Sequence, residues 1–384
     1  MKKPIRILSS TMDVLGEIDD YESMFFTRSW HGVGSIELRM NRHKRYADQL
    51  LKDNLILVGN DLNKVFIIKH REIELNQEGK VTENWIIKGY SLKSIVAGRV
   101  TIPPPQSAYD SANGSYESVM KHYIDNHLVN PIDLDRKVNH LVIAASSERG
   151  GQTSYSSRFK NLADEMYALS LASGLGWEIS IDLDNKQWIF DVVEGKDLTQ
   201  KQSQNPPVIF SPQFEAVESM SYVQSDLNYK NFAYIAGQGE GVNRRVITVG
   251  NASGLDRYEI FIDARDVAEV DDDENPIPEH IIVQKLTERG QQQLNEFLQE
   301  EYLESQILTH SPFKYEKDYN LGDVVTVQNL DWGATLDTRI TEIKEIYEVD
   351  GFKIEATFGN KQPTLIQKIK QELASYDLVS EDWG

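Results

Sequence analysis

The chain has 384 residues, no cysteine and a formal net charge of −20, from 60 acidic and 40 basic residues. Its length is enough for several cores and usually corresponds to more than one domain. The lack of cysteine excludes disulfides, thiolate metal sites and thiol nucleophiles, and the charge is opposite in sign to that of a typical nucleic-acid-binding protein. We expect no signal peptide and no membrane span, because no apolar run approaches the roughly 18 residues that a span requires.

Residues 1–100 are predicted to form a β domain. Ile36, Leu38 and Met40 alternate with polar residues, which is the pattern of a strand with one buried face. Further apolar runs follow, and the segment Trp85–Tyr90 is expected to return antiparallel to the run before it.

Residues 101–215 are predicted to form an inserted α+β domain, after the rigid connector Pro103-Pro104-Pro105. A first helix is expected to begin with Ser115 as its N-cap. Its apolar stripe consists of Tyr116, Val119, Met120, Tyr123, Ile124 and Leu128. A second helix is expected to end at Gly174, and a β-hairpin with its turn at Asp184-Asn185 follows.

Residues 216–270 return to strand patterns, and we expect them to complete the β domain begun by residues 1–100. An acidic loop and a connecting helix are assigned to residues 271–307, with the helix at about 285–305. A final segment, 363–384, is expected to contain a short amphipathic helix.

Residues 308–362 are predicted to form a second small β domain. Asp350-Gly351 is a dipeptide favoured in type I′ hairpin turns, and Phe352, Ile354, Ala356 and Phe358 alternate with polar residues after it. The segment Arg339–Glu348 also fits helical spacing, but its β-branched residues and flanking turn favour a bulged strand.

Gly237, Gly239 and Gly241 resemble a nucleotide-binding loop, but such a loop must lie between a strand and a helix. Here the residues after it, Arg245–Val249, have a strand pattern. We therefore favour a glycine-rich hairpin loop.

Two groups of residues could bind a metal ion. Asp271–Glu274 is a run of carboxylates, but it lacks the glycine of a calcium loop, so a solvated acidic loop is favoured. His122 and His127 flank Asp125 on the first expected helix, and a spacing of five residues separates two side chains on an α-helix by about 140°. We therefore expect no metal site and no bound cofactor.

No catalytic residue is nominated. The chain contains none of the common serine-hydrolase, zinc-protease or phosphate-binding motifs, and carboxylates are too abundant to assign a glycosidase pair without geometry. Five tryptophans lie in apolar patterns and are core candidates before they are candidates for stacking on carbohydrate. They are Trp30, Trp85, Trp177, Trp188 and Trp332.

Several stretches taken in order resemble one family. Asp318–Asp323, followed by a valine run, Arg339–Glu342 and a closing strand that ends at Phe358-Gly359, resembles the last domain of siphophage tail hub proteins, the tail-associated (Tal) proteins of the tail tip. Gly89–Leu92 and Asn228–Gly241 also resemble this family. The resemblance covers about residues 1–365.

The resemblance implies a fold related to the hubs of contractile tails and type VI secretion spikes. It implies a homotrimeric ring at the distal end of a virion tail, assembled in the host bacterial cytoplasm. The partners implied are the distal tail protein, the tail tube and the tape-measure protein, with receptor-binding or lysin proteins as further candidates. DNA would pass through without specific binding.

We therefore expect a β-dominated multidomain protein with two small β-barrel-like domains around an inserted α+β segment. Strands of 1–100 with 216–270 should superpose on those of 308–360 as two related barrels. The hub assignment fails if these two regions have unrelated topologies or form one continuous sheet. The alternatives are a tail-associated peptidoglycan or glycan hydrolase and a host-glycan binding module. A lysin domain normally lies beyond the hub region, and little chain remains for one.

Overall fold

The computed structural model describes residues 2–73, 83–270, 275–308, 311–349 and 351–359. The expected acidic loop Asp271–Glu274 and the helix expected within 363–384 lie outside these residues. The described chain forms two compact units, which are considered separately. The first comprises Met1–Ser221 and Leu303–Gly359, and the second Tyr222–Tyr302.

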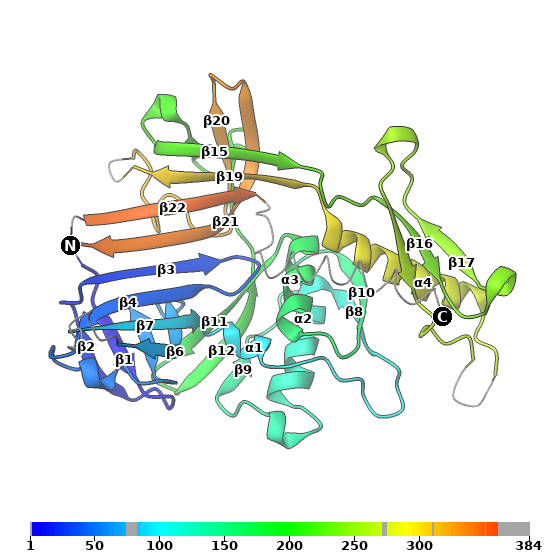
Figure 1. The fold of residues 1–384 in the computed structure, drawn as a ribbon, viewed down its shortest axis with the longest axis horizontal. Coiled ribbons are helices and arrows are strands. Elements are labelled where there is room, and N and C mark those ends of the chain that lie inside the picture. Colours follow the sequence, from blue (N-terminus) through cyan, green and yellow to red (C-terminus); the bar gives the residue numbers. More distant parts are fainter. Residues whose placement is uncertain (1, 74–82, 271–274, 309–310, 350, 360–384) are drawn as a thin grey trace, which may run out of the picture. The chain divides into compact units, whose positions relative to one another are not determined.

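A sheet of 14 strands dominates the first unit (Figure 1). The strands along its main path run in the order β15-β19-β22-β21-β3-β4-β7-β6-β5-β1-β2. Their bounds are β1 Ile5–Leu8, β2 Val14–Ile18, β3 Ser23–Ser29, β4 Ser35–Asn41, β5 Leu55–Val58, β6 Val65–Glu72, β7 Asn84–Ser91, β15 Val217–Ser225, β19 Glu300–Ile307, β21 Ala334–Glu348 and β22 Gly351–Gly359.

Strand β5 and the first half of β6 are buried on both faces of this sheet. On one face Ile56 and Phe66 pack with Phe26 and Leu38 of β3 and β4. On the other face, neighbouring side chains of β5 and β6 enter a second core beneath the helices. This burial explains the near-continuous apolar runs of β5 and β6, whereas β4 shows the predicted alternation of buried and wetted residues.

The two predicted barrels are not formed by the described residues. None of their sheets closes on itself, and the strands of 1–100 are continuous with those of 308–359 because β3 pairs antiparallel with β21. Glu342 lies opposite Ser29 and Tyr347 opposite Met24 in this pairing. Strand β21 therefore occupies the edge of β3 that could otherwise have paired to close a barrel. Of the described stretch 216–270, β15 joins this sheet, and the remaining strands of the stretch form a separate one.

The C-terminal strands agree with their local patterns. β21 pairs with β22 through a register shift between Ile340 and Glu342, so the bulged strand predicted for Arg339–Glu348 is confirmed. Phe358 and Ala356 of β22 are buried, as their alternation predicts.

The α+β part of the first unit lies between these strands in sequence. Its helices are α1 Ser94–Ala97, α2 Tyr116–Ile124 and α3 Leu162–Ser173, and its strands are β8 Asp110–Ser115, β9 Leu141–Ile143, β10 Gln152–Ser157, β11 Gly176–Asp182, β12 Gln187–Val193, β13 Asp197–Leu198 and β14 Ile209–Phe210. The last two strands pair with β20, Val324–Asn329, which is itself bonded to β21.

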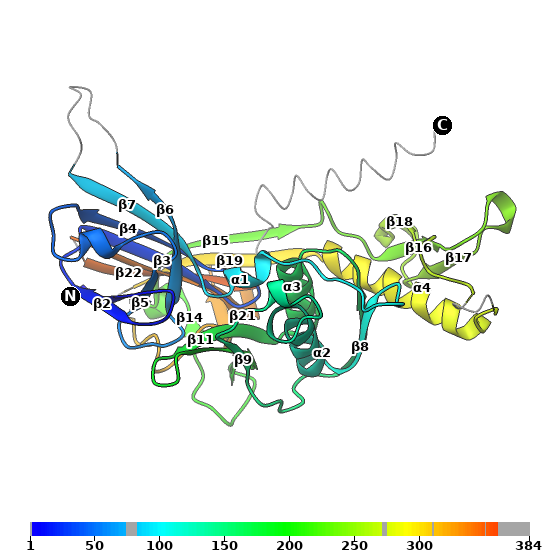
Figure 2. The same ribbon diagram turned by 90° about the horizontal axis from the view of Figure 1, so that it is seen from below.

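The predicted helix boundaries in this part are confirmed. The Ser115 side chain accepts a hydrogen bond from the backbone N–H of Ser118 at 3.1 Å, and Gly174 ends α3 in the left-handed conformation. Figure 2 shows β11 and β9 on one side of the large sheet, where Ile179 and Phe190 enter the same core as Leu57 and Ile67. A pocket lies where β11 meets the end of β3 in this packing.

The second unit is a small sheet with one helix. β16 Phe232–Ala236 lies between β17 Val246–Val249 and β18 Glu259–Asp263, and α4 Glu279–Leu294 packs against them. The connecting helix predicted for about 285–305 thus begins earlier and ends at Leu294. Residues 300–307 form strand β19, in which Leu303, Ser305 and Ile307 are buried with a period of two.

Candidate functional site

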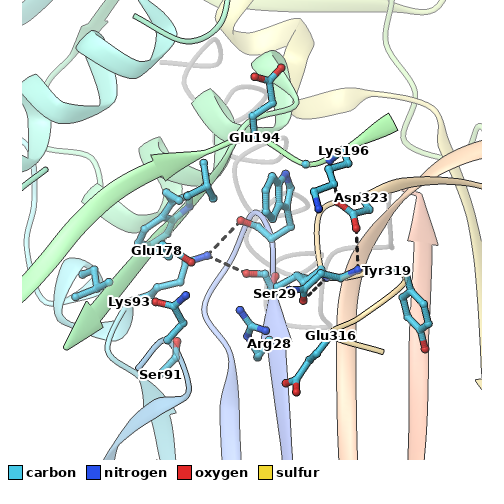
Figure 3. A pocket seen from close by; sticks show the side chains of 18 of the residues that line it. Arg28, Ser29, Ser91, Lys93, Glu178, Glu194, Lys196, Glu316, Tyr319 and Asp323 are labelled. Carbon is cyan, nitrogen blue, oxygen red and sulfur yellow. Dashed lines mark hydrogen bonds between the residues drawn. The ribbon is translucent and has the colours of Figure 1, made fainter. Parts of the chain in front are cut away.

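A pocket of about 300 Å³ opens in the first unit. It is lined by the end of β3, by β11, by the connection after β12, and by the segment 316–323. Figure 3 shows charged side chains from all of these elements around it. The pocket thus brings together residues that are far apart in the sequence.

Lys93, at the start of α1, supplies one cation to the pocket wall. Its ammonium donates hydrogen bonds to the carbonyl oxygens of Ser29 at 2.9 Å and Trp30 at 3.2 Å, both drawn in Figure 3. The nitrogen also lies 4.1 Å from the ring centroid of Trp177. Burial lowers the pKa of Lys93 well below its ordinary value, and the nearby Arg28 charge acts in the same direction.

Arg28 supplies the second cation. It follows Met24 and Phe26 at a period of two on β3, so its side chain extends from the inward-facing row of the large sheet. One guanidinium nitrogen donates to the hydroxyl of Tyr315 at 3.2 Å. Burial opposes the charge, but the fields of Tyr315, Asp61 and Glu178 outweigh it, and the net effect raises the pKa of Arg28.

Three of the carboxylates around the pocket have fixed partners. Asp323 accepts backbone N–H bonds from Lys196 and Asn320, each at 2.8 Å, and Asp318 accepts one from Lys314 at 2.8 Å. These bonds shape the loop that closes the pocket.

The third of these carboxylates, Glu316, forms an ion pair with Lys64. Burial acts to raise the pKa of Glu316, but the bond and charge of Lys64 outweigh it and hold the pKa below its ordinary value.

The remaining two carboxylates differ in environment. Burial raises the pKa of Glu178 above its ordinary value, although Arg28 and Lys93 partly offset the effect. Glu194 points away from Glu178 in Figure 3. The pocket therefore presents fixed charges suited to binding, rather than the two facing carboxyl groups that glycoside hydrolysis requires.

A second buried polar cluster contradicts an expectation from helical spacing. After Ile124 the helix widens into a π-helical turn, Asp125–Val129, and the N–H of Asn130 bonds to the carbonyl of Asp125 at 2.7 Å. In this geometry residues five apart share a face. His122 and His127, expected to diverge, therefore both approach Asp110, at 2.7 and 2.9 Å respectively.

The Asp110 cluster fixes β8 against α2. The Asp110–His122 contact has hydrogen-bond geometry, whereas the His127 contact is short but poorly aligned, because neither nitrogen of His127 has a correctly oriented partner. Burial acts to raise the pKa of Asp110, but the two imidazoles outweigh it and hold the pKa below its ordinary value. Within the described ranges no group of three or more His, Asp or Glu side chains is arranged to hold a metal ion.

The glycine-rich segment is a hairpin connection, and the tryptophans differ in their exposure. Gly237–Gly241 connects β16 and β17, which pair antiparallel, so the hairpin interpretation is confirmed. Trp30 and Trp177 are buried, as predicted, but Trp332 is 53% exposed.

Charged residues of the pocket such as Arg28, Lys93 and Glu178 were not identified from the sequence. Lys93 and Glu178 lie in no pattern that distinguishes them from other charged residues of the chain. The period of β3 could have identified Arg28 as an inward-facing charge.

The model of the family described as Siphovirus ReqiPepy6 Gp37-like protein matches residues 4–360. A search of curated proteins found no match. Among solved structures, the prophage MuSo2 43 kDa tail protein from Shewanella oneidensis has a TM-score of 0.56 at 10% identity, with 93% of this chain and 98% of that chain covered. A tail protein from Neisseria meningitidis MC58 has a TM-score of 0.53 at 12% identity, with 93% and 96% covered. Prophage tail protein gp18 from Listeria monocytogenes EGD-e has a TM-score of 0.50 at 12% identity, with 98% and 99% covered.

Proposed function

Since the chain belongs to the Siphovirus ReqiPepy6 Gp37-like protein family, we propose that it is a structural hub subunit at the distal tip or baseplate of a siphophage tail. The observation that carries this proposal is the extent of the match, which spans residues 4–360 and thus nearly all of the described chain. The fold supports it, because it is shared over almost the full length with prophage tail proteins. The two end regions form one continuous sheet, which is the outcome that we set against the hub role. The proposal therefore rests on the family match and on the shared fold, and not on the expected pair of barrels.

The large sheet favours assembly with further copies or partners. Its path ends in β2 at one edge and β15 at the other, and within the described chain each of these pairs on one side only. An exposed strand edge carries unpaired backbone N–H and C=O groups, which natural proteins protect or pair. Pairing of β2 in one copy with β15 in the next is a head-to-tail contact, and it gives a ring when the rotation closes. Three copies around the tail axis is the arrangement that we propose.

In that ring the distal tail protein and the tail tube would contact one end, and the tape-measure protein and DNA would pass through the centre. The net charge of −20 would then keep DNA from binding to the channel wall, because phosphate is retained mainly by lysine and arginine. Only charges within about 8 Å of the passing DNA matter at physiological salt. We therefore propose a carboxylate-rich inner surface and a gate that opens mechanically, without turnover.

The rival functions have less support. A tail-associated hydrolase requires converging carboxylates, and the pocket's acidic side chains are mostly committed to structural contacts. A glycan-binding module requires an aromatic platform, and among the five tryptophans in the described ranges Trp332 is the one with a largely exposed side chain. No helix of the described chain is long and apolar enough to cross a membrane.

Immunogold labelling of intact virions tests the location. Antibodies raised against the purified protein should label the distal tail end, and mass measurement of the extracted tip complex should give three copies per particle. Labelling along the tail tube, at the capsid or on no virion structure would contradict the proposal.

A further inference from the structure

Phe159 has a backbone conformation that an aromatic residue rarely adopts. Its φ is +51°, in the left-handed region where glycine and asparagine are favoured. It lies between β10 and α3, where its N–H donates to the carbonyl of Thr101 at 2.8 Å and the N–H of Thr101 donates to the carbonyl of Lys160 at 2.9 Å. Phe159 and Lys160 thus both face Thr101, as in a β-bulge whose left-handed residue is commonly glycine. A phenylalanine therefore stands where glycine would be less strained.

The side chain of Phe159 contributes little to the fold. It is 60% exposed. The guanidinium of Arg158 lies 5.3 Å from its ring centroid, and such a contact is weak when it is exposed. Strained residues persist chiefly at functional sites, where binding or catalysis requires them. The exposed ring is therefore a candidate contact for another molecule.

The chain segment bonded to this bulge adds exposed apolar side chains. Val100 and Ile102 are 42% and 39% exposed, on either side of the fully buried Thr101. This alternation directs both of them to the outer side of the segment. Because Thr101 is hydrogen-bonded to Phe159, these three apolar side chains lie next to one another at the surface.

Three arginines without an ion pair border these apolar side chains. Arg136 donates to the carbonyl of Val100 at 2.6 Å, and Arg99 donates to the carbonyl of Arg136 at 3.2 Å. Burial and the charge of Arg99 lower the pKa of Arg136, and the charge of Asp133 offsets this effect only in part. Among the described residues, no carboxylate lies within 4.0 Å of these two guanidiniums or of that of Arg158.

We propose that this surface docks an acidic segment of a partner protein that also carries an apolar side chain. The Phe159 surface, as we call it, consists of Arg99, Val100, Ile102, Arg136, Arg158 and Phe159. Its arginines can accept carboxylates, and its apolar side chains can cover a hydrophobic residue between them. Arginine and aromatic residues are enriched at the centres of protein interfaces. The hydrogen bonds of the bulge hold the ring in place before binding, which lowers the entropic cost of association.

An anionic membrane fits the Phe159 surface less well. Membrane surfaces are bound by clusters of about four to eight lysines and arginines, whereas this surface has three arginines, two of which are half-buried and bonded to carbonyls. The net charge of −20 would also oppose the approach of the whole chain to such a membrane. An acidic protein segment can reach the arginines without bringing the rest of the chain close to a charged plane.

Fluorescence anisotropy with labelled, end-blocked peptides tests the proposal. The probe has the sequence EELFEE, and the matched peptides are EEGSEE, which lacks the apolar residues, and QQLFQQ, which lacks the charge. We expect saturable binding of EELFEE to the full chain, about tenfold tighter than that of either matched peptide. Added sodium chloride should weaken it, because the charges lie at the surface.

Phe159→Asn removes the ring and keeps a residue that tolerates the left-handed region. It should weaken binding by about tenfold and leave the melting temperature within about 2 °C of the wild type, whereas a merely structural ring would change the second quantity and not the first. Arg158→Gln should weaken binding by about two- to fivefold. The controls, Phe214→Asn and Arg42→Gln, replace an exposed phenylalanine and an exposed arginine elsewhere in the first unit and should bind as the wild type does.

Four results would overturn the proposal. They are the absence of saturable EELFEE binding, equal affinity for EEGSEE, wild-type affinity of Phe159→Asn, and tighter binding of phosphatidylserine vesicles than of the peptide, which would assign the surface to a membrane. Three of these need no variant, so the proposal stays testable even if Phe159→Asn fails to fold. Because the assay uses no tail and no other tail protein, its failure would leave the proposed hub function unaffected.

Discussion

We expect replacement of Lys64 to weaken the contact between the N-terminal strands and the C-terminal strands of the large sheet. Its side chain is fully buried and forms ion pairs with Glu316 and with Glu345 of β21. Glu345 is 1% exposed, whereas Glu316 is 39% exposed. The Lys64 nitrogen also lies 5.0 Å from the ring centroid of Tyr315. One ammonium thus connects the turn before β6 with the C-terminal strands.

Lys64→Met removes the charge and keeps most of the side-chain length. Glu316 can recover water, but Glu345 would retain, among the described residues, the Tyr347 hydroxyl at 2.7 Å and Lys3 at 4.0 Å. Removing one partner of a buried pair costs about 3–5 kcal/mol, because the other charge stays buried. Since Glu316 is partly exposed, we expect a loss of about 3 kcal/mol, which lowers the melting temperature of a unit of this size by roughly 6–12 °C.

The assay is urea unfolding followed by tryptophan fluorescence. The five described tryptophans all lie in the first unit, so the transition reports on that unit. The control is Lys44→Met, which breaks a pair with Asp20 in which the side chains are 48% and 49% exposed, and it should cost less than about 1 kcal/mol. Lys64→Met combined with Glu345→Gln should recover much of the loss. A Lys64→Met variant as stable as the control, or a strictly additive double variant, would refute this reasoning.

Acid stability, one glycine contact and the absence of hydrolysis can each be tested separately. The carboxyl of Asp110 has a pKa below its ordinary 3.8, so its contribution to stability is present above that value and is lost as the pH falls below it. In thermal unfolding, Asp110→Asn should reduce the dependence of the melting temperature on pH in this acidic range. An unchanged dependence would contradict the lowered pKa of Asp110. Gly322→Ala places a Cβ 2.1 Å from the Trp30 ring at φ +92°, whereas Gly333→Ala meets no atom within 4 Å at φ +63°. Both variants incur a backbone cost of about 1 kcal/mol, and we expect Gly322→Ala to lose about 1–3 kcal/mol more stability than Gly333→Ala. Equal losses in the two variants would count against the close approach of Gly322 to Trp30. The purified protein should release no reducing ends or amino groups from host cell walls, and release that one carboxylate substitution abolishes would establish a hydrolase.

Local patterns in the sequence were sufficient for many elements. The alternation of Ile36, Leu38 and Met40 identified β4 and its buried face, and Ser115 marked the start of α2. In Arg339–Glu348 the β-branched residues predicted a bulged strand despite a spacing that also fits a helix, and the structure has a strand with a bulge there. These features depend on neighbouring residues, which the sequence shows directly.

Features that depend on distant residues could not be predicted in this way. The pairing of β3 with β21 joins segments more than 300 residues apart, and no local pattern distinguishes it from closure of a barrel. The approach of His122 and His127 to Asp110 depends on a π-helical turn that α-helical spacing excludes. The pocket likewise forms only when β3, β11 and the 316–323 segment meet.

The central claim is that this chain is a hub subunit at the distal tip of a siphophage tail. A cryo-electron microscopy reconstruction of the intact tail tip tests it most directly. We predict three copies of the chain around the tail axis, each with its large sheet joined to a neighbouring chain at β2 or β15. Density for the chain elsewhere in the virion, or a tip ring built without it, would contradict the account.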